Sequence, residues 1–389
     1  MKTISTQHNT DAIERKHPWL MVRLGDVCEV RAGANYRDVE DPNGRYPIYG
    51  TGGIMGRASQ YRCPAHSVIV GRKGTLDNPY LVDEPFWNID TCFGVVPSER
   101  IIPEYLFRFC QGFDFYSLVP ASGRPSTTSD AVRAIEIPLP PLPVQREIVA
   151  RLERELAAVE KVKKGFEALA ETAKAEFKAE LKEVFESGEL RVESGELAVR
   201  RVKLGEICET ITDGDHQPPP KSSQGVPFLV ISNVASGRIS FENTRFVPRA
   251  YYEAIQENRK PRKGDVLLTV TGSYGIPVVV ETDDMFCFQR HIALIRASRL
   301  DSKFLAYVLQ SPESKRYFDL VATGAAQKTI GLGSIRAMSI PFPSMSAQRQ
   351  IVDRLSAAKA RTEKLEAKAR EGVAVCETMR KAILKEAFE

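Results

Sequence analysis

The sequence predicts an α+β fold: two mixed α/β domains in tandem repeat, separated by two long antiparallel helices that form a coiled-coil spacer. The first observation is a duplication, because residues 138–186 recur as residues 341–389 at a constant offset of 203 positions. The second is a periodicity. Apolar or small residues from Ile148 to Val184 recur about every 3.6 residues, which is the spacing of one helix face. The best preserved part of the repeat is therefore a long helix.

This helical segment is longer than one compact domain needs. Between residues 144 and 186 there is no proline, and the only glycine is Gly165. A continuous helix over this segment extends roughly 60 Å at about 1.5 Å per residue. Two such amphipathic helices can bury their apolar stripes against each other, which predicts an antiparallel coiled coil. The stripe and docking positions that we predict are Ile148, Leu152, Val159, Phe166, Leu169, Ile351, Leu355 and Leu365.

A second pair of matching segments marks the start of each copy. Residues 22–29 recur as residues 202–209 at an offset of 180, so the second copy gains residues before the helices. Insertions collect in surface loops, and this layout predicts a constant scaffold that carries a variable middle. The predicted boundaries are a flexible tail at 1–18, a first domain at 19–143, its long helix at 144–187, a second domain at 188–343 and a C-terminal long helix at 344–389.

Short strands and one small helix are predicted inside each domain. Apolar runs with the pattern of buried strands end in glycine-containing turns, and each small helix is followed by a polar loop and then by prolines. The predicted strand, helix and polar loop occupy residues 67–70, 103–110 and 122–128 in the first copy, and 265–270, 302–309 and 323–329 in the second.

The composition is that of a globular protein without a membrane span. Apolar residues make up 43% and charged residues 27% of the 389 positions. No apolar run approaches the roughly 18–20 residues that a membrane helix requires. Seven cysteines without a Cys-x-x-Cys pair predict neither a disulfide framework nor a zinc site, so we expect a cytoplasmic protein and no bound metal. A net charge of +4 does not by itself indicate a nucleic-acid partner.

Two motifs only partly match catalytic signatures. Gly50 and Gly52 begin a dinucleotide-type loop, but the third glycine is replaced by Met55, so a simple turn is favoured. Residues 77–80 nearly spell the adenine-methyltransferase tetrapeptide but lack its second proline. No nucleophile–base pair, P-loop or carboxylate cluster is present, and the sequence predicts that the chain is not an enzyme.

Three further features have two interpretations each. The proline-rich loop at residues 213–220 is either turn chemistry or a reader of base edges and phosphates. The basic run at residues 259–263 is either a solvated surface or a phosphate contact. Trp87 is expected in the core rather than on a stacking surface.

The repeated residues 133–149 and 336–352 resemble the conserved regions of specificity (S) subunits of type I restriction–modification systems. The Thr-Asp-Gly-x-His motif at residues 212–216, the segment at 264–275 and the segments at 46–50 and 70–75 are similar to target recognition domains of that family. The resemblance covers nearly the whole chain. It implies a non-catalytic DNA-binding subunit whose two target recognition domains each read half of a bipartite, asymmetric double-stranded DNA site.

The resemblance also implies partners. Two modification (methyltransferase) subunits would dock on the helices, and motor–nuclease restriction subunits would complete the complex. S-adenosylmethionine is expected on the modification subunit, and no cofactor is expected on this chain. The alternative is a protein-binding structural adaptor without sequence-specific DNA recognition. A self-sufficient methyltransferase is a further, disfavoured class.

Polar side chains at strand ends and glycine turns are our candidates for DNA contact. In the first domain they are Arg57, Arg72, Lys73, Thr75, Asn78, Arg124 and Ser126. In the second domain they are His216, Gln217, Lys221, Thr271, Ser273, Tyr274, Gln327 and Lys328. Arg290 and His291 also lie beside a predicted strand end.

Overall fold

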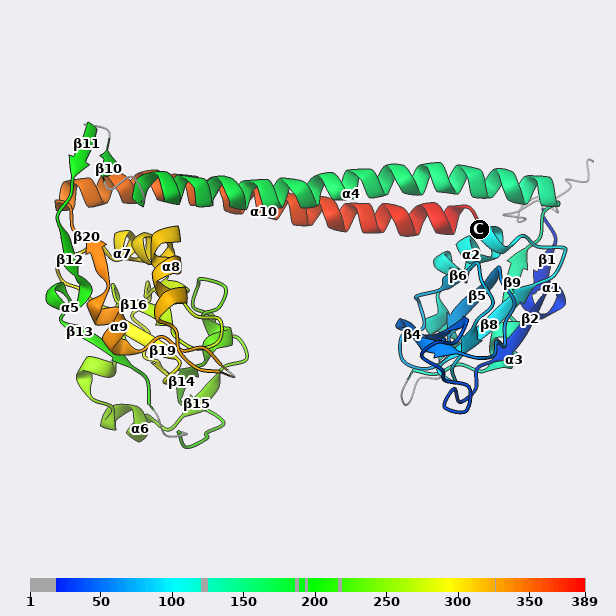
Figure 1. The fold of residues 1–389 in the computed structure, drawn as a ribbon, viewed down its shortest axis with the longest axis horizontal. Helices are drawn as coiled ribbons and strands as arrows, with labels where there is room; N and C mark the ends of the chain where they lie inside the picture. The colour runs from blue at the N-terminus through cyan, green and yellow to red at the C-terminus, as the bar shows by residue number, and fades with distance from the viewer. Residues whose placement is uncertain are drawn as a thin grey trace, which may run out of the picture. The chain divides into compact units, whose positions relative to one another are not determined.

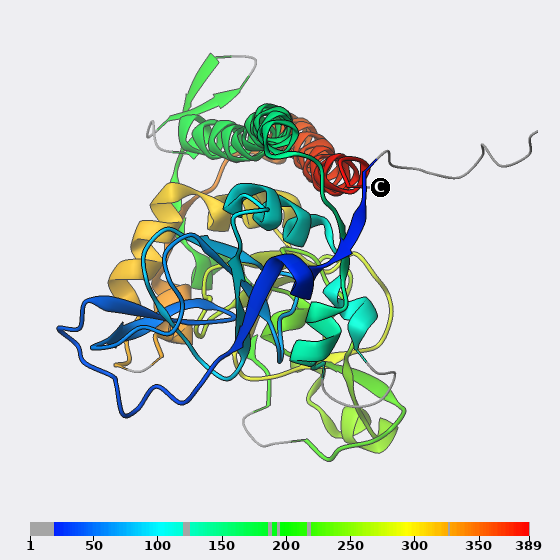
Figure 2. The ribbon, with the colours of Figure 1, turned by 90° about the vertical axis from the view of Figure 1, so that its right-hand side faces the viewer.

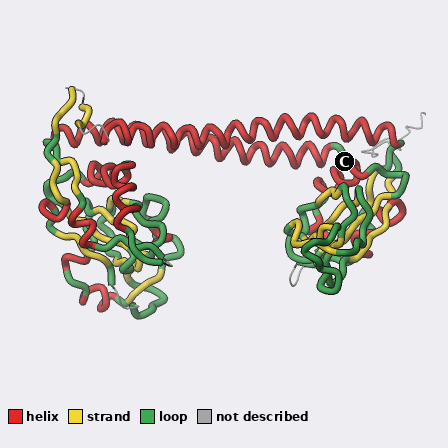
Figure 3. The backbone as a smooth tube through the Cα atoms, viewed as in Figure 1, coloured by secondary structure: helices red, strands yellow, loops and turns green. Residues whose placement is uncertain are grey.

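The computed structural model describes residues 19–119, 125–185, 189–192, 195–215, 219–325 and 327–388. The chain forms two compact units, shown as a ribbon in Figure 1 and as a tube coloured by secondary structure in Figure 3. Unit 1 comprises residues 1–167 and 370–389, and unit 2 comprises residues 168–369. Each unit therefore combines a mixed α/β domain with parts of both long helices, and the predicted α+β tandem architecture is confirmed.

The described residues of unit 1 form three small sheets and four short helices, followed by the long helix α4. The elements are β1 (Met21–Arg23), α1 (Leu24–Val27), β2 (Cys28–Ala32), β3 (Tyr46–Gly50), β4 (Gly53–Ala58), β5 (Ser67–Gly71), β6 (Tyr80–Val82), β7 (Trp87–Asn88), β8 (Cys92–Pro97), α2 (Pro103–Gly112), η1 (Phe115–Leu118), α3 (Ser129–Arg133), β9 (Glu136–Pro138) and α4 (Leu142–Phe185).

The main sheet of unit 1 is antiparallel, in the order β2-β8-β5-β6. Every residue of β5 is buried, which is why its apolar run was readable in the sequence. A second sheet has the order β4-β3-β7, with β3 and β7 parallel, and β1 pairs with β9. Trp87 of β7 is 8% exposed and lies in the core, as predicted.

Unit 2 repeats this plan with different loops. Its elements are β10 (Glu189–Val192), β11 (Gly195–Ala198), β12 (Arg201–Lys203), α5 (Leu204–Ile207), β13 (Thr210–Asp213), β14 (Val226–Leu229), η2 (Ile231–Asn233), β15 (Arg245–Val247), α6 (Arg249–Ala254), η3 (Glu257–Arg259), β16 (Val266–Thr269), β17 (Pro277–Val279), β18 (Cys287–Phe288), β19 (Ile292–Arg296), α7 (Ser302–Gln310), α8 (Pro312–Val321), α9 (Leu332–Ala337), β20 (Ser339–Pro341) and α10 (Met345–Glu386).

Apart from the β10-β11 pair, the sheets of unit 2 correspond to those of unit 1. The order β13-β19-β16-β17 matches the main sheet, β15-β14-β18 matches the second sheet, and β12 pairs with β20 as β1 pairs with β9. The repeated arginines explain part of this match. Arg133 donates to Val30 O at 3.2 Å in unit 1, and Arg336 donates to Ile211 O at 2.5 Å in unit 2. Each arginine thus connects a short helix near the end of its domain, α3 or α9, to an edge strand of the main sheet, β2 or β13.

The end of α10 belongs to the core of unit 1. The Phe388 ring lies edge-on to Tyr105 and Phe109 of α2, with ring centroids 5.2 and 5.5 Å away. Figure 2, in which unit 1 faces the viewer, shows α2 beside the end of α10. The corresponding contact in unit 2 is made by the end of α4, where Phe185 lies edge-on to Phe304 at 6.0 Å. Each helix therefore starts in one unit and completes the core of the other.

Within each unit the two helices run antiparallel. In unit 1, Lys163 pairs with Glu377, and Phe166 lies so close to Gly372 that a Cβ there would come within 2.5 Å of the ring. In unit 2, Arg354 Nε lies 2.9 Å from Glu180 Oε1. Helix α4 spans Leu142–Phe185 and helix α10 spans Met345–Glu386.

The buried stripe differs from the prediction in the middle of α4. Leu169 is 37% exposed and Val162 is 53% exposed, whereas Leu152, Val159 and Ala173 are buried. The buried positions repeat every seven residues, as in a coiled coil with about 3.5 residues per turn. Leu169 therefore lies outside the buried seam between the helices, and its role in docking stays a prediction. The other predicted positions, Ile148, Phe166, Leu365, Ile351 and Leu355, are half-buried or buried.

No helix in the described ranges has both the length and the apolar character needed to cross a membrane. Across the same ranges, His, Cys, Asp and Glu side chains form no group of three or more that could hold a metal ion.

Candidate nucleic-acid interface

Two loops meet at the end of the buried strand β5 in unit 1. The backbone of Lys73 forms an antiparallel bridge with Ser126, Gly74 N donates to Pro125 O at 3.2 Å, and Thr127 N donates to Arg72 O at 2.9 Å. Gly74 has φ +79°, a left-handed conformation that L side chains rarely adopt. We call residues 72–75 and 125–127 the paired loops of unit 1.

The same backbone arrangement occurs after β16 in unit 2. Thr271 forms the bridge with Thr329, Gly272 N donates to Lys328 O at 3.0 Å, and Ile330 N donates to Val270 O at 2.8 Å. Gly272 has φ +70°. Residues 270–273 and 328–330 are the paired loops of unit 2. By these hydrogen bonds Lys73 corresponds to Thr271, Pro125 to Lys328 and Ser126 to Thr329. Thr75 and Ser273 are the residues that follow the equivalent glycines Gly74 and Gly272.

Asp90 contacts both cationic side chains of the unit 1 paired loops. Lys73 Nζ lies 3.1 Å from Asp90 Oδ2, and Arg72 donates to the backbone oxygen of Asp90 at 3.4 Å. The Arg72 guanidinium also lies over the Phe93 ring, 5.6 Å from its centroid. The lysine is about half exposed, so its charge still faces solvent. The sequence did not predict a role for Asp90, although it indicated Arg290 and His291, which occupy the positions in unit 2 equivalent to Asp90 and Thr91.

In unit 2 the third segment of this arrangement is Arg290–His291. Val270 N donates to His291 O at 2.9 Å, as Arg72 N donates to Thr91 O at 2.8 Å in unit 1. Burial, and then the nearby charge of Arg290, lower the pKa of His291 below its usual 6.5. The imidazole is therefore neutral at physiological pH and can both donate and accept a hydrogen bond.

The remaining unit 2 loop candidates lie close to one another. The Gln327 amide nitrogen lies over Gly272, 2.9 Å from where a Cβ would be. Ser273 O accepts a hydrogen bond from Thr269 Oγ1 at 2.7 Å. Tyr274 OH donates to Asp319 Oδ1 at 2.9 Å, and this hydrogen bond raises the pKa of Tyr274.

Two candidates of unit 1, Arg57 and Asn78, make hydrogen bonds outside the paired loops. The Arg57 guanidinium donates to the carbonyls of Gly44 and Arg45, at 3.3 and 2.8 Å, and thereby closes a neighbouring loop. Asn78 donates to Tyr80 OH, and Tyr80 OH in turn donates to Thr51 O at 3.5 Å. Asn78 thus connects the segment after the first paired loop to the β3–β4 hairpin.

Of the remaining candidates, Lys221 lies near β15, and the others fall outside the described residues. Lys221 is exposed beside Ser222, which bridges to Phe246 of β15 rather than to the paired loops. Arg124, His216 and Gln217 lie outside the described residues. In the same proline-rich loop, Asp215 accepts a hydrogen bond from Tyr251 OH at 2.7 Å.

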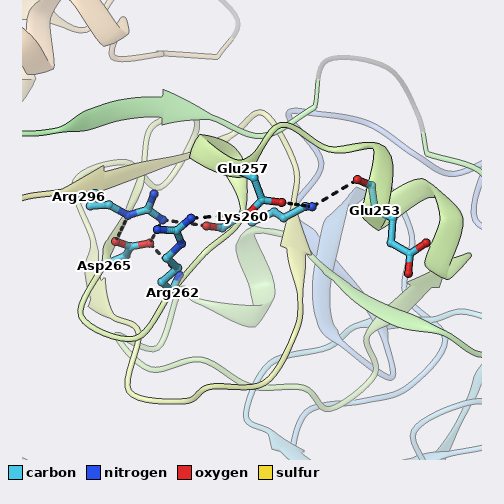
Figure 4. A network of polar contacts seen from close by, with 6 residues as sticks. All are labelled: Glu253, Glu257, Lys260, Arg262, Asp265 and Arg296. Atoms are coloured by element: carbon cyan, nitrogen blue, oxygen red, sulfur yellow. Dashed lines mark hydrogen bonds and ion pairs between the residues drawn. The ribbon is translucent and has the colours of Figure 1, made fainter.

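The basic run at residues 259–263 is engaged with carboxylates of its own unit. Lys260 and Arg262 both face Glu257, with nitrogen–oxygen distances of 2.5 and 3.6 Å. Arg259 lies 3.3 Å from Asp213, and Lys263 lies 3.5 Å from Asp283. Figure 4 shows the Lys260 side chain between Glu257 and the backbone of Glu253. These contacts favour a structural role over the phosphate contact that the sequence left open.

The two units thus present the same backbone twice with different polar side chains, on a duplicated scaffold. This arrangement defines a tandem-repeat protein in which the scaffold is constant and the polar loops differ. The chain belongs to the family of the type I restriction modification DNA specificity domain, which it matches twice, at residues 16–165 and 198–373.

Similar proteins carry matching descriptions. The chain is 22% identical to the type I restriction enzyme EcoBI specificity subunit of Escherichia coli, over 95% of this chain and 85% of that protein. It is 25% identical to the MjaVIII specificity subunit of Methanocaldococcus jannaschii, over 87% of this chain and 85% of that protein.

Solved structures share the fold. One is a chain from a structure concerned with complex assembly and conformational transition of the type I R-M system, with a TM-score of 0.74, 24% identity and coverage of 96% of this chain and 98% of that one. Another is the HsdS subunit from Thermoanaerobacter tengcongensis, with a TM-score of 0.53, 24% identity and coverage of 97% and 99%.

Family membership decides between the function classes left open by the sequence. The family is a DNA specificity family of type I restriction–modification systems, so the chain is a DNA-recognition component and not the catalytic one. The alternative of a protein-binding adaptor without DNA recognition is not supported by it.

Proposed function

We propose that each unit reads one half of a bipartite, asymmetric double-stranded DNA site through its paired loops. The observation that carries the proposal is the duplicated backbone of the paired loops, in which equivalent positions hold different side chains. Lys73 corresponds to Thr271, and Pro125 corresponds to Lys328. Because base edges are distinguished by their donors and acceptors, a constant backbone with different polar side chains suits the reading of two different half-sites.

The side chains divide by chemistry into two roles. Lys73 in unit 1 and Lys328 in unit 2 are suited to phosphate, because an ammonium group attracts the backbone charge without reading sequence. Thr75 and Ser126 in unit 1, and Ser273 and Gln327 in unit 2, offer neutral donors and acceptors that suit base edges. Arg124, His216 and Gln217 remain predicted contacts.

The long helices are proposed to set the separation of the half-sites and to dock two modification subunits. Both helices contribute to both units, so each unit offers a similar pairing of α4 and α10 to a partner. Motor–nuclease restriction subunits would complete the complex. S-adenosylmethionine would bind the modification subunit, and this chain would bind no cofactor. Seven free cysteines among the described residues support a reducing, cytoplasmic setting.

The decisive experiment maps methylated adenines in cells that carry this chain with its modification partner. We expect two adenines in a bipartite motif with a fixed gap. Gel shifts of the assembled complex should then show tighter binding to that motif than to a duplex with both halves scrambled. Binding that does not depend on sequence, together with an unmethylated genome, would exclude the proposal and favour an adaptor.

A further inference from the structure

The β3–β4 hairpin of unit 1 presents two large apolar side chains to solvent. Ile54 is 64% exposed and Met55 is 55% exposed, and they are consecutive in β4. Gly50 pairs with Gly53 across the turn at Thr51 and Gly52, and a Cβ at Gly52 would meet nothing within 4 Å. Consecutive strand residues point to opposite faces, so Ile54 and Met55 make both sides of the hairpin tip apolar and exposed.

Hydrogen bonds connect this tip to the candidate nucleic-acid interface. Thr51 O in the turn accepts from Tyr80 OH, and Tyr80 OH accepts from Asn78. Asn78 lies only three residues beyond Thr75 of the paired loops. The exposed tip and the polar loop therefore form neighbouring parts of one surface in unit 1.

In unit 2 a longer connection takes the place of this tight turn. Its strand β14 corresponds to β3, because Phe228 pairs in parallel with Cys287 as Ile48 pairs with Trp87. After β14 the chain passes through the 3-10 helix η2 and a loop before β15 returns antiparallel to β14. The hairpin is thus a point at which the two copies diverge, as expected for a part that reads a different sequence in each half.

We infer that the β3–β4 hairpin enters the major groove and that Ile54 contacts the methyl group of a thymine in the half-site read by unit 1. The inference rests on the proposed function. A two-stranded ribbon fits the major groove, and the thymine methyl is the apolar group that a base edge presents there. Met55 packs on Gly50 of β3, because its sulfur lies 2.8 Å from where a Gly50 Cβ would be.

The test uses the full chain in complex with its modification subunits, on duplexes of the mapped target sequence. Each thymine of the unit 1 half-site is replaced in turn by deoxyuracil, which keeps the hydrogen-bonding groups and lacks the methyl. We expect one replacement to weaken wild-type binding about fourfold, the effect of losing one buried methyl. Ile54→Ala should bind the thymine duplex more weakly and should no longer distinguish it from that uracil duplex.

Leu20→Ala is the matched control, because Leu20 is an exposed apolar residue of the same unit at 69% exposure and should leave binding unchanged. A half-site without thymine on either strand overturns the inference, as does an Ile54→Ala complex that keeps wild-type uracil sensitivity. Loss of subunit assembly in Ile54→Ala, seen by size-exclusion chromatography, would make the tip a protein contact and also overturn it. If the proposed function itself fails, no duplex is bound specifically by any variant, which separates the two failures.

Discussion

The side-chain oxygen of Gln145 accepts a hydrogen bond from the backbone N–H of Ile102 at 2.9 Å. The amide nitrogen of Gln145 donates to Pro140 O and Arg100 O, at 2.9 and 3.0 Å, and its side chain is fully buried. Through these hydrogen bonds Gln145, in the first turn of α4, connects the proline-rich segment before α4 to the residues that precede α2.

Gln348 makes matching bonds in unit 2. Its oxygen accepts from Asp301 N at 2.8 Å, and its nitrogen donates to Pro343 O at 3.0 Å. The repeated glutamine therefore fixes the direction in which each long helix leaves its own domain. Its chemistry was not evident from the sequence, which showed only that it was repeated.

Replacing Gln145 with leucine should lower the unfolding free energy of unit 1 by about 3 kcal/mol, because buried groups of Ile102, Pro140 and Arg100 lose their partner. Hydrogen exchange across α2 and the start of α4 measures the change. Gln348→Leu is the matched variant and should affect only unit 2. Equal protection in wild type and both variants would show that the glutamines are dispensable.

Phe388→Ala should destabilise unit 1 by about 3 kcal/mol, because the ring is 9% exposed and packs on Tyr105 and Phe109. Phe185→Ala is its counterpart in unit 2, against Phe304. Thermal unfolding followed by limited proteolysis identifies the unit that opens first. The assignment of the helix ends is wrong if Phe388→Ala opens unit 2 before unit 1.

A buried ion pair should matter in unit 2 alone. Arg296 donates two hydrogen bonds, of 2.9 and 2.7 Å, to the Asp265 carboxylate (Figure 4). The Arg296 side chain is 13% exposed and the Asp265 side chain is 3% exposed. Arg296→Met leaves a buried carboxylate without its charge partner and should cost about 3–5 kcal/mol in denaturant unfolding. The double variant Asp265→Leu with Arg296→Met should recover most of that loss. No recovery would mean that the arginine acts through its bond to Lys260 O instead.

Loop variants should separate phosphate contacts from base contacts. Lys73→Ala should weaken binding to all duplexes alike and reduce the slope of log affinity against log salt by about one. Gln327→Ala should cost about 1–3 kcal/mol on the target only and relax one base position. Asp90→Asn is the control for Lys73, because it removes the carboxylate that pairs with the lysine and should strengthen binding. If Lys73→Ala and Gln327→Ala both bind like wild type, the paired loops are not the interface.

The duplication, the fold class and the family resemblance were predictable from the sequence because repeated residues and periodic apolar positions are local patterns. The strand β5 and the helix α2 were likewise readable from burial patterns. The hydrogen bonds between residues 73 and 126, and between 271 and 329, were not, since they join segments more than fifty positions apart. The engagement of the basic run by Glu257, Asp213 and Asp283 also depends on three-dimensional packing, which composition does not reveal.

The spacer proposal predicts a change of gap without a change of half-site. Removing one heptad from each helix, residues 165–171 and 367–373, keeps the seven-residue seam in register. It also keeps the Lys163–Glu377 pair in unit 1 and leaves Lys174 and Glu366, 3.9 Å apart in unit 2, in place. Seven residues at about 1.5 Å each shorten the helices by about 10 Å, or about three base pairs of duplex.

Methylated-adenine mapping in cells with this double deletion should therefore return the same two half-sites with a gap shorter by about three base pairs. A deletion of four residues from α4 alone is the contrasting variant, because it moves Phe166 and Ala173 out of register with α10 and should abolish methylation. Half-sites that change while the gap stays constant would show that the helices take part in reading and do not act as the spacer.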